Sequence, residues 1–184
     1  ETIGLFQVES RAQMSILPKL NPTCFYDIIV SIALVRPGPI QGNIIHPYLR
    51  RRRGDEAVVY LHPSLEPILK RTLGVPLFQE QGMKLAVVSA GFTPSQADNL
   101  RRVMSHKRSQ EKMDALCVDL AIGMRKNGFT EVAIQTITHQ LRAFANYGFP
   151  ESHAASFALL TYASSYIKCH YPDIFACALL NSQP

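Results

Sequence analysis

The sequence is poor in residues that make covalent cross-links or metal sites. Trp is absent, and the cysteines are Cys24, Cys117, Cys169 and Cys177. No two of them have the C-x2-C spacing of a zinc or redox site, so we expect reduced, buried thiols in a cytoplasmic protein. No run of 18 apolar residues occurs. We therefore expect no membrane-spanning segment and no membrane partner.

Motifs of common catalytic sites are also missing. There is no G-x-x-x-x-G-K-[ST] loop, no G-x-S-x-G and no H-E-x-x-H. The 14 acidic residues include no Asp-x-Asp or similar close set in an apolar strand. Phosphoryl transfer by two metal ions requires such a set. The sequence therefore predicts no catalytic residue and no metal ligand in this chain.

The first ten residues, ETIGLFQVES, lack the basic start and the cleavage site of a signal peptide. They also begin without Met and read like the middle of a protein. We interpret the chain as a fragment of a longer protein.

What the sequence has in abundance is helical pattern and positive charge. The 184 residues are 47% hydrophobic and carry a net charge of +5, which fits one domain and favours a polyanionic partner. Apolar residues recur at helical spacing, with start signals at Thr23, Thr93 and Thr130. The predicted fold is mainly α, with at most a small β-hairpin near residues 57–78.

The stretch from Asn146 to Pro172 combines a turn, a helix start and a histidine. Ser152 is the predicted N-cap, and the small residues after His153 leave the first-turn amides open. A helix start of this kind can bind a phosphate, with His153 as a further donor. An ordinary buried helix with a capping or core histidine explains the same pattern.

Two clusters of basic residues are candidates for phosphate binding. The first is Arg50, Arg51, Arg52 and Arg53, and the second is Arg101, Arg102, His106, Lys107 and Arg108. Guanidinium groups bind phosphate through paired hydrogen bonds. For each cluster, a solvated basic helix end or face is the competing interpretation. The weaker pair Lys168 and His170 reads as surface residues that complement a helix dipole.

Five segments in order carry a resemblance to a known family. They are Gly4–Ser10 (GLFQVES), Leu34–Pro39 (LVRPGP), Phe78–Gln81 (FQEQ), Ala97–Met104 (ADNLRRVM) and Tyr147–Ala155 (YGFPESHAA). Together they resemble the bacterial C-family DNA polymerases, which include the alpha subunit of DNA polymerase III. The resemblance covers essentially the whole chain. One departure is Gly82, where the family usually has an apolar residue; glycine there weakens a helix.

The resemblance implies that residues 1–184 are a fingers domain. Its N-terminal part, 1–78, would hold the Arg-rich segment and loops, and 79–184 would be the helical part that contacts nucleotide. Arg101 and Arg102 match the family's Leu-Arg-Arg motif, while Ser152 and His153 match its Ser-His-Ala-Ala motif. These residues are expected to bind the dNTP. The catalytic carboxylates and their Mg²⁺ belong to the palm, outside this chain.

The implied function is positioning of the dNTP triphosphate by a DNA-directed DNA polymerase. The implied partners are dNTP, primer-template DNA, the palm and thumb, and, through the parent, the sliding clamp and mutagenesis accessory proteins. The expected location is the cytoplasm, at the nucleoid. Without the palm, the fragment is expected to be inactive.

Some details resemble the error-prone branch of the family, which acts in translesion synthesis and DNA repair. This chain has GFPESHAASFA where replicative members usually have GFNKSHAAAYA, and it carries the run Arg50–Arg53. Two other hypotheses remain. One is a stand-alone helical module that binds DNA phosphates, and the other is a helical scaffold whose basic surface is incidental.

Overall fold

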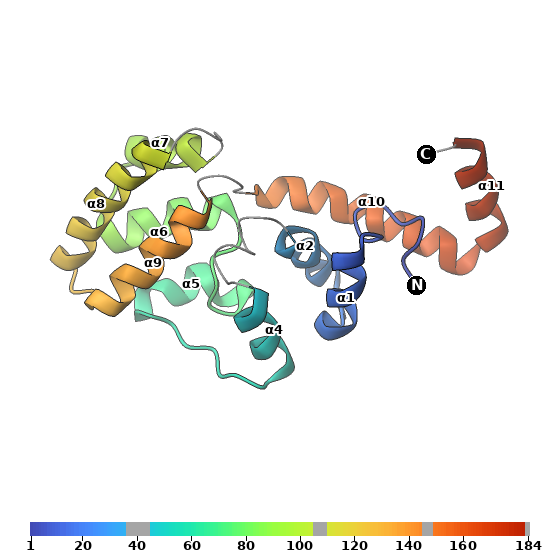
Figure 1. Ribbon diagram of the computed structural model, residues 1–184, viewed down its shortest axis with the longest axis horizontal. Coiled ribbons are helices and arrows are strands. Elements are labelled where there is room, and N and C mark those ends of the chain that lie inside the picture. The colour runs from blue at the N-terminus through green and yellow to red at the C-terminus, as the bar shows by residue number, and fades with distance from the viewer. Residues whose placement is uncertain (36–44, 105–109, 145–148, 183–184) are drawn as a thin grey trace. The chain divides into compact units, whose positions relative to one another are not determined.

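The computed structural model (Figure 1) describes four stretches of the chain, which are residues 1–35, 45–104, 110–144 and 149–182. Their regular structure is helical, so the predicted mainly α fold is confirmed. The described residues contain no strand. Their only pairing of strand type is an isolated parallel bridge between Phe78 and Phe149. The small β-hairpin that the sequence allowed near residues 57–78 is therefore not formed in the described part of that range.

The chain divides into two compact units. Unit 1 combines residues 1–33 with residues 152–184, and unit 2 is the segment between them, Leu34–Glu151. Both of the predicted parts, 1–78 and 79–184, contribute to both units. Each unit is described by itself below.

Unit 2 contains most of the buried apolar residues of the described stretches. Its helical segments are α4 (Ile45–Arg53), η1 (Pro63–Leu65), α5 (Glu66–Leu69), η2 (Lys70–Thr72), α6 (Gln79–Ala90), α7 (Pro94–Met104), α8 (Gln110–Lys126) and α9 (Glu131–Phe144). Helix α6 packs on α7 and α8, and α8 packs on α9. Leu85, Leu100 and Met113 are among the fully buried side chains at these contacts. Such an apolar core is the main source of stability of the unit.

Local start and stop signals determine where the helices of unit 2 begin and end. At the start of α7, Thr93 and Gln96 exchange hydrogen bonds in a capping box, as predicted: the Gln96 amide donates to the Thr93 hydroxyl, and the Thr93 amide donates to the Gln96 side chain. Helix α6 ends at Gly91, which has a φ of 71°. A left-handed residue of this kind commonly ends a helix, and glycine adopts it without strain.

Two glycines allow the helices of unit 2 to approach each other closely. A Cβ added to Gly123 of α8 would overlap the backbone carbonyl of Ala90 at the end of α6. A Cβ added to Gly82 of α6 would lie 3.2 Å from Leu141 and 3.3 Å from the sulfur of Met104. Gly82 is thus explained by close packing in the core.

Unit 1 is built from the two ends of the chain. Its helices are α1 (Arg11–Leu20), α2 (Phe25–Leu34), α10 (Glu151–His170) and α11 (Pro172–Ser182), with the unit boundaries at the last residue of α2 and the first of α10. Helix α1 was not predicted, although Ser10 caps it by accepting a hydrogen bond from the Gln13 amide.

Contacts between distant residues close unit 1. The hydroxyl of Thr161 on α10 donates to the carbonyl of Phe6 at 2.9 Å. The ammonium of Lys168 donates to the carbonyl of Ile3 at 2.6 Å. The side-chain amide of Gln13 on α1 donates to the carbonyl of Ser31 on α2 at 2.8 Å. The N-terminal segment is therefore held along α10, and Lys168 has a structural role that the sequence did not reveal.

Candidate functional site

Helix α7 presents two arginines on a rigid base. The base is the buried side of the helix, where Leu100, Val103 and Met104 are almost inaccessible to solvent. Arg101 and Arg102 lie on the other side, and 70% of the Arg102 side chain is exposed. A helix anchored in this way holds the stems of both side chains at a fixed position over the surface.

Asp98 braces both guanidinium groups. Its Oδ1 accepts from Nε and Nη2 of Arg101 at 3.0 and 2.9 Å, and its Oδ2 lies 2.9 Å from Nε of Arg102. The hydrogen bond from Arg101 is the main reason why the pKa of Asp98 lies below its ordinary value. The three groups together carry one net positive charge. The spacing of Asp98, three and four residues before the arginines, was readable from the sequence.

A shallow polar hollow lies beside this pair. It encloses about 350 Å³ and is lined by Ser95, Gln96, Asp98, Asn99 and Arg102. Neutral amide and hydroxyl groups at this position can accept or donate hydrogen bonds to a polar ligand.

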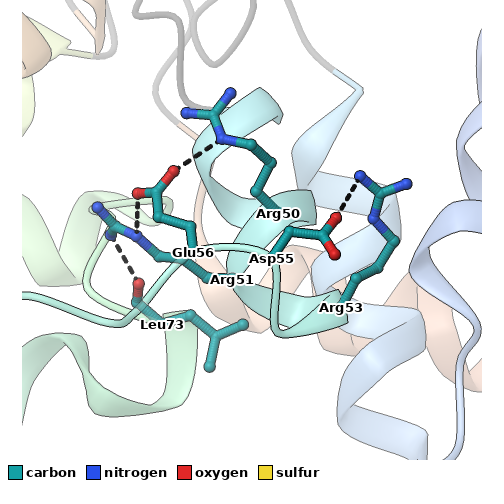
Figure 2. Close-up of polar contacts among 6 residues, drawn as sticks. All are labelled: Arg50, Arg51, Arg53, Asp55, Glu56 and Leu73. Atoms are coloured by element: carbon teal, nitrogen blue, oxygen red, sulfur yellow. Dashed lines mark hydrogen bonds and ion pairs between the residues drawn. The ribbon is translucent and has the colours of Figure 1, made fainter.

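The Arg-rich segment at the end of α4 is partly used within the protein (Figure 2). Arg51 donates from Nε to Glu56 at 2.9 Å and from Nη1 to the Leu73 carbonyl at 2.8 Å, and only 14% of its side chain is exposed. Arg50 donates to the other oxygen of Glu56 at 2.8 Å. The hydrogen bond from Arg50 is the main reason why the pKa of Glu56 lies below its ordinary value, and the hydrogen bond from Arg51 lowers that pKa further.

The remaining arginines of this segment are more open. Arg53 pairs with Asp55 at 2.6 Å and about half of its side chain is exposed (Figure 2). The side chain of Arg52 has intermediate exposure. Arg51 thus ties α4 to the loop at Leu73, while the side chains of Arg50 and Arg53 are about half exposed.

The start of α10 differs from the prediction in one respect. The helix begins at Glu151, so Ser152 is its second residue and not the N-cap. The Glu151 amide donates to Oε2 of Glu80 at 2.9 Å, and Glu80 lies on α6, 71 positions earlier. Pro150, which has no amide hydrogen, directly precedes the helix. A carboxylate from another helix therefore replaces the predicted local cap.

Ser152 and His153 lie in the exposed first turn of α10. The His153 ring meets the ring of Phe157 edge-on, with centroids 5.2 Å apart. The Ser152 carbonyl accepts from the hydroxyl of Ser156 at 3.1 Å. Ala154 is buried and faces the packed side of the helix.

The structure places the predicted nucleotide-binding residues in both units. Arg101 and Arg102 belong to unit 2 and share Asp98, whereas Ser152 and His153, which follow Glu151 in α10, belong to unit 1. The predicted phosphate contacts Lys107 and Arg108 lie outside the described residues. Sequence reasoning missed two carboxylates. Asp98 pairs with the arginines of α7, and Glu80 accepts a hydrogen bond at the start of α10.

Neither a metal cluster nor a transmembrane helix is found in the described stretches. Residues 1–35, 45–104, 110–144 and 149–182 contain no group of three or more His, Cys, Asp or Glu side chains arranged to hold an ion. Of the helices in those same stretches, none has the length and apolar character needed to cross a bilayer.

Comparison with known proteins identifies relatives over the whole chain. An error-prone DNA polymerase of Anaeromyxobacter dehalogenans (strain 2CP-C) is 62% identical over all 184 residues, which cover 16% of that protein. Error-prone DNA polymerases of Methylococcus capsulatus and Pseudomonas fluorescens are 58% and 56% identical over the whole chain, which covers 18% of each. The chain thus spans less than a fifth of these relatives, and the predicted resemblance to the error-prone branch is confirmed.

A family model also matches the first two-thirds of the chain. It describes the finger domain of the bacterial DNA polymerase III alpha subunit, and it covers residues 1–128. This stretch includes α7 with its arginine pair and the Arg-rich end of α4. The chain therefore belongs to the finger-domain family of the bacterial DNA polymerase III alpha subunit.

Proposed function

We propose that this chain is the fingers domain of an error-prone DNA polymerase and that it positions the triphosphate of the incoming dNTP. The observation that carries the proposal is the braced arginine pair of α7. Arg101 and Arg102 are exposed, share the single carboxylate of Asp98 and stand on a buried helix face. Exposed guanidinium groups on a buried helix face can bind a multiply charged phosphate chain through paired hydrogen bonds.

Arg101 and Arg102 would act by exchanging the carboxylate of Asp98 for the triphosphate of the nucleotide. In the absence of nucleotide, Asp98 keeps both guanidinium groups ordered at hydrogen-bond distance. A triphosphate carries more charge and more acceptor oxygens than one carboxylate, so it competes for the same donors. Because the arginines are already oriented, little side-chain entropy is lost when the nucleotide binds. Phosphoryl transfer depends mainly on such positioning and charge neutralisation.

Ser152 and His153 are two further residues proposed to bind the nucleotide. Both lie in the first turn of α10, where the helix dipole favours an anion and a hydroxyl or ring N–H can donate to phosphate oxygens. The exposed members of the Arg-rich segment, together with Lys107 and Arg108, would contact the phosphate backbone of primer-template DNA.

The chemistry itself is assigned to the parent enzyme. The metal ions that this reaction uses, Mg²⁺ in our proposal, would be held by palm carboxylates outside this chain. The described residues offer no suitable cluster, so no step is assigned to a metal here. The palm and thumb, and further the sliding clamp and mutagenesis accessory proteins, are the proposed partners of the parent in translesion synthesis and repair at the nucleoid. The isolated chain would be inactive.

Nucleotide incorporation by the full polymerase tests the proposal. We expect Arg102→Ala and His153→Ala each to raise the KM for dNTP about tenfold to a hundredfold, because each loses a hydrogen bond to a charged phosphate. Arg125→Ala on α8 is the matched control, since Arg125 is exposed and pairs with Glu131. Unchanged kinetics in both Arg102→Ala and His153→Ala would overturn the assignment.

A further inference from the structure

The segment Phe78–Gln81 is tied to three other parts of unit 2. Gln81 is 6% exposed, and its Oε1 accepts from the amides of Leu77 and Phe78 at 2.8 and 3.1 Å. Its Nε2 donates to the Thr72 hydroxyl at 2.8 Å and to the Ile68 carbonyl at 3.1 Å. A single buried amide group thus uses both of its ends, and it fixes the start of α6 against η2 and α5.

The same segment holds the chain immediately before α10. Phe78 is completely buried and forms the parallel bridge with Phe149. The Gln79 amide donates to the Phe149 carbonyl at 3.1 Å. The backbone two residues before α10 is therefore attached to the first residue of α6.

Glu80 adds a charged contact to the helix start itself. Its carboxylate accepts from the Glu151 amide at 2.9 Å. Pro150 has no amide hydrogen, so the amide of Glu151 is the first donor available at this end of α10. A carboxylate is favoured there because the helix dipole is positive at this end. Nη1 of Arg71 lies 3.8 Å from Oε1 of Glu151. This ion pair is largely exposed and therefore weaker than the contact with Glu80.

We propose that Glu80 is a positioning residue that holds the first turn of α10, and with it Ser152 and His153, for nucleotide binding. This inference rests on the proposed function. His153 follows Glu151 by two residues in the same helix, about 3 Å along its axis, so movement of Glu151 moves His153 by a similar distance. Glu80 itself contacts Glu151 and not the nucleotide.

Hydrogen exchange in the full polymerase without nucleotide tests the contact directly. We expect Glu80→Ala to accelerate exchange of the first-turn amides of α10 about tenfold, because a helix cap is lost. Glu80→Gln keeps an acceptor but loses the charge, so a smaller acceleration is expected. Unchanged exchange in Glu80→Ala would overturn the proposal.

The matched control is Glu111→Ala. Glu111 and Glu80 are both acidic and both occupy the second position of their own helix, α8 and α6 respectively. Glu111→Ala therefore removes the same charge from an equivalent helix position. It should leave exchange at the start of α10 unchanged, and an acceleration equal to that of Glu80→Ala would overturn the specific role of Glu80.

A double-mutant cycle separates positioning from a general loss of stability. We expect Glu80→Ala to raise the KM for dNTP about tenfold while DNA affinity stays the same. In a His153→Ala background, Glu80→Ala should add less than about twofold, because both variants remove the same interaction. Effects that multiply independently would overturn the positioning role.

The hydrogen-exchange and kinetic measurements together also distinguish failure of this inference from failure of the proposed function on which it rests. If His153→Ala leaves nucleotide kinetics unchanged, the proposed nucleotide site is wrong at that residue and the kinetic role of Glu80 falls with it. The exchange measurement still decides whether Glu80 holds α10, since it requires no nucleotide.

Discussion

The two units of the molecule differ in how they use charge. Unit 2 has sixteen Lys or Arg residues and ten Asp or Glu residues. Unit 1 has three Lys or Arg residues and four Asp or Glu residues. The whole positive excess of the chain therefore belongs to unit 2. A polyanion would be attracted by this unit, and the net charge of the complete chain conceals that asymmetry.

The units differ equally in what they bury. Helices α6 to α8 of unit 2 contain several fully buried apolar side chains, while none of the residues of α11, all of them described, is buried. On α10, Leu159 and Leu160 are exposed, and the buried residues are Ala154, Ala158 and Thr161. Unit 2 thus combines a buried core with a charged surface, whereas in unit 1 the buried apolar residues are concentrated on α2, and α10 and α11 expose apolar side chains.

The largest expected effect compares the same substitution in the two units. Leu85→Ala on α6, where the side chain is 1% exposed, should lower the free energy of unfolding by about 2–5 kcal/mol. Leu159→Ala on α10, where it is 61% exposed, should change it by less than about 0.5 kcal/mol. Urea denaturation of the chain measures both. Equal losses would show that the exposure of these two leucines does not determine what they contribute to stability.

A pair of glycines in unit 2 separates close packing from backbone strain. Gly123→Ala should destabilise the chain by about 1–3 kcal/mol, although alanine normally strengthens a helix, because the methyl group would overlap the Ala90 carbonyl. Gly128 has a φ of 81°, and a methyl group added to it would have no neighbour within 4 Å. Gly128→Ala should therefore cost about 1 kcal/mol through strain alone. Thermal unfolding of both variants ranks them, and a stabilised Gly123→Ala would show that α8 can move away from α6.

The charge difference predicts which arginines matter for DNA. Under the proposed function, Arg53→Ala in unit 2 should reduce the dependence of log Kd on log salt by about one unit for a short duplex. Arg11 of unit 1 is also exposed, and Arg11→Ala should leave that slope unchanged. Titrations at several salt concentrations give the slopes. An equal reduction in both variants would mean that the asymmetry of charge does not direct DNA binding.

The smallest expected effect concerns the ion pairs that brace unit 2. The hydrogen bond from Arg125 holds the pKa of Glu131 below its ordinary value. This pair therefore stabilises the fold above the unfolded pKa of Glu131 and loses that contribution as the pH falls through the folded pKa. Glu131→Gln should be slightly less stable than the wild type at pH 7.

That difference should vanish in acid. Once Glu131 is protonated, residue 131 is neutral in the wild type as well as in the variant. Raising the salt concentration at pH 7 should also reduce it, since the pair is exposed. Unfolding curves between pH 7 and pH 3 provide the measurement. A difference that does not shrink as the pH falls would have to come from something other than this ion pair.

Local signals in the sequence predicted much of unit 2. The capping box joins Thr93 and Gln96, which are three residues apart, so the start of α7 was readable from the sequence. In unit 1, α1 was not predicted although Ser10 caps it, and it contains Pro18, a residue that disfavours a helix interior.

Contacts between distant residues were beyond such reasoning. The Glu80 cap of α10 joins residues 71 positions apart, and the Arg51 contact with the Leu73 carbonyl joins residues 22 apart. No periodicity or motif specifies either pair. This is why Ser152 was wrongly predicted as the N-cap, and why Arg51 was grouped with arginines that remain more exposed. The basic pair on α7 was predicted, but its brace Asp98 was overlooked.

The hydrogen bond between Thr161 and the Phe6 carbonyl has a consequence for synthesis of the protein. The two residues are 155 positions apart, and all of unit 2 is translated between the two halves of unit 1. At about 5–20 residues per second, the first half waits on the order of ten seconds for α10 to leave the ribosome. Unit 2 can fold during that interval, since its segments are continuous. Unit 1 is therefore expected to be the last part of this chain to fold, and its N-terminal helices are the segment that a nascent-chain chaperone would encounter before α10 and α11 are available.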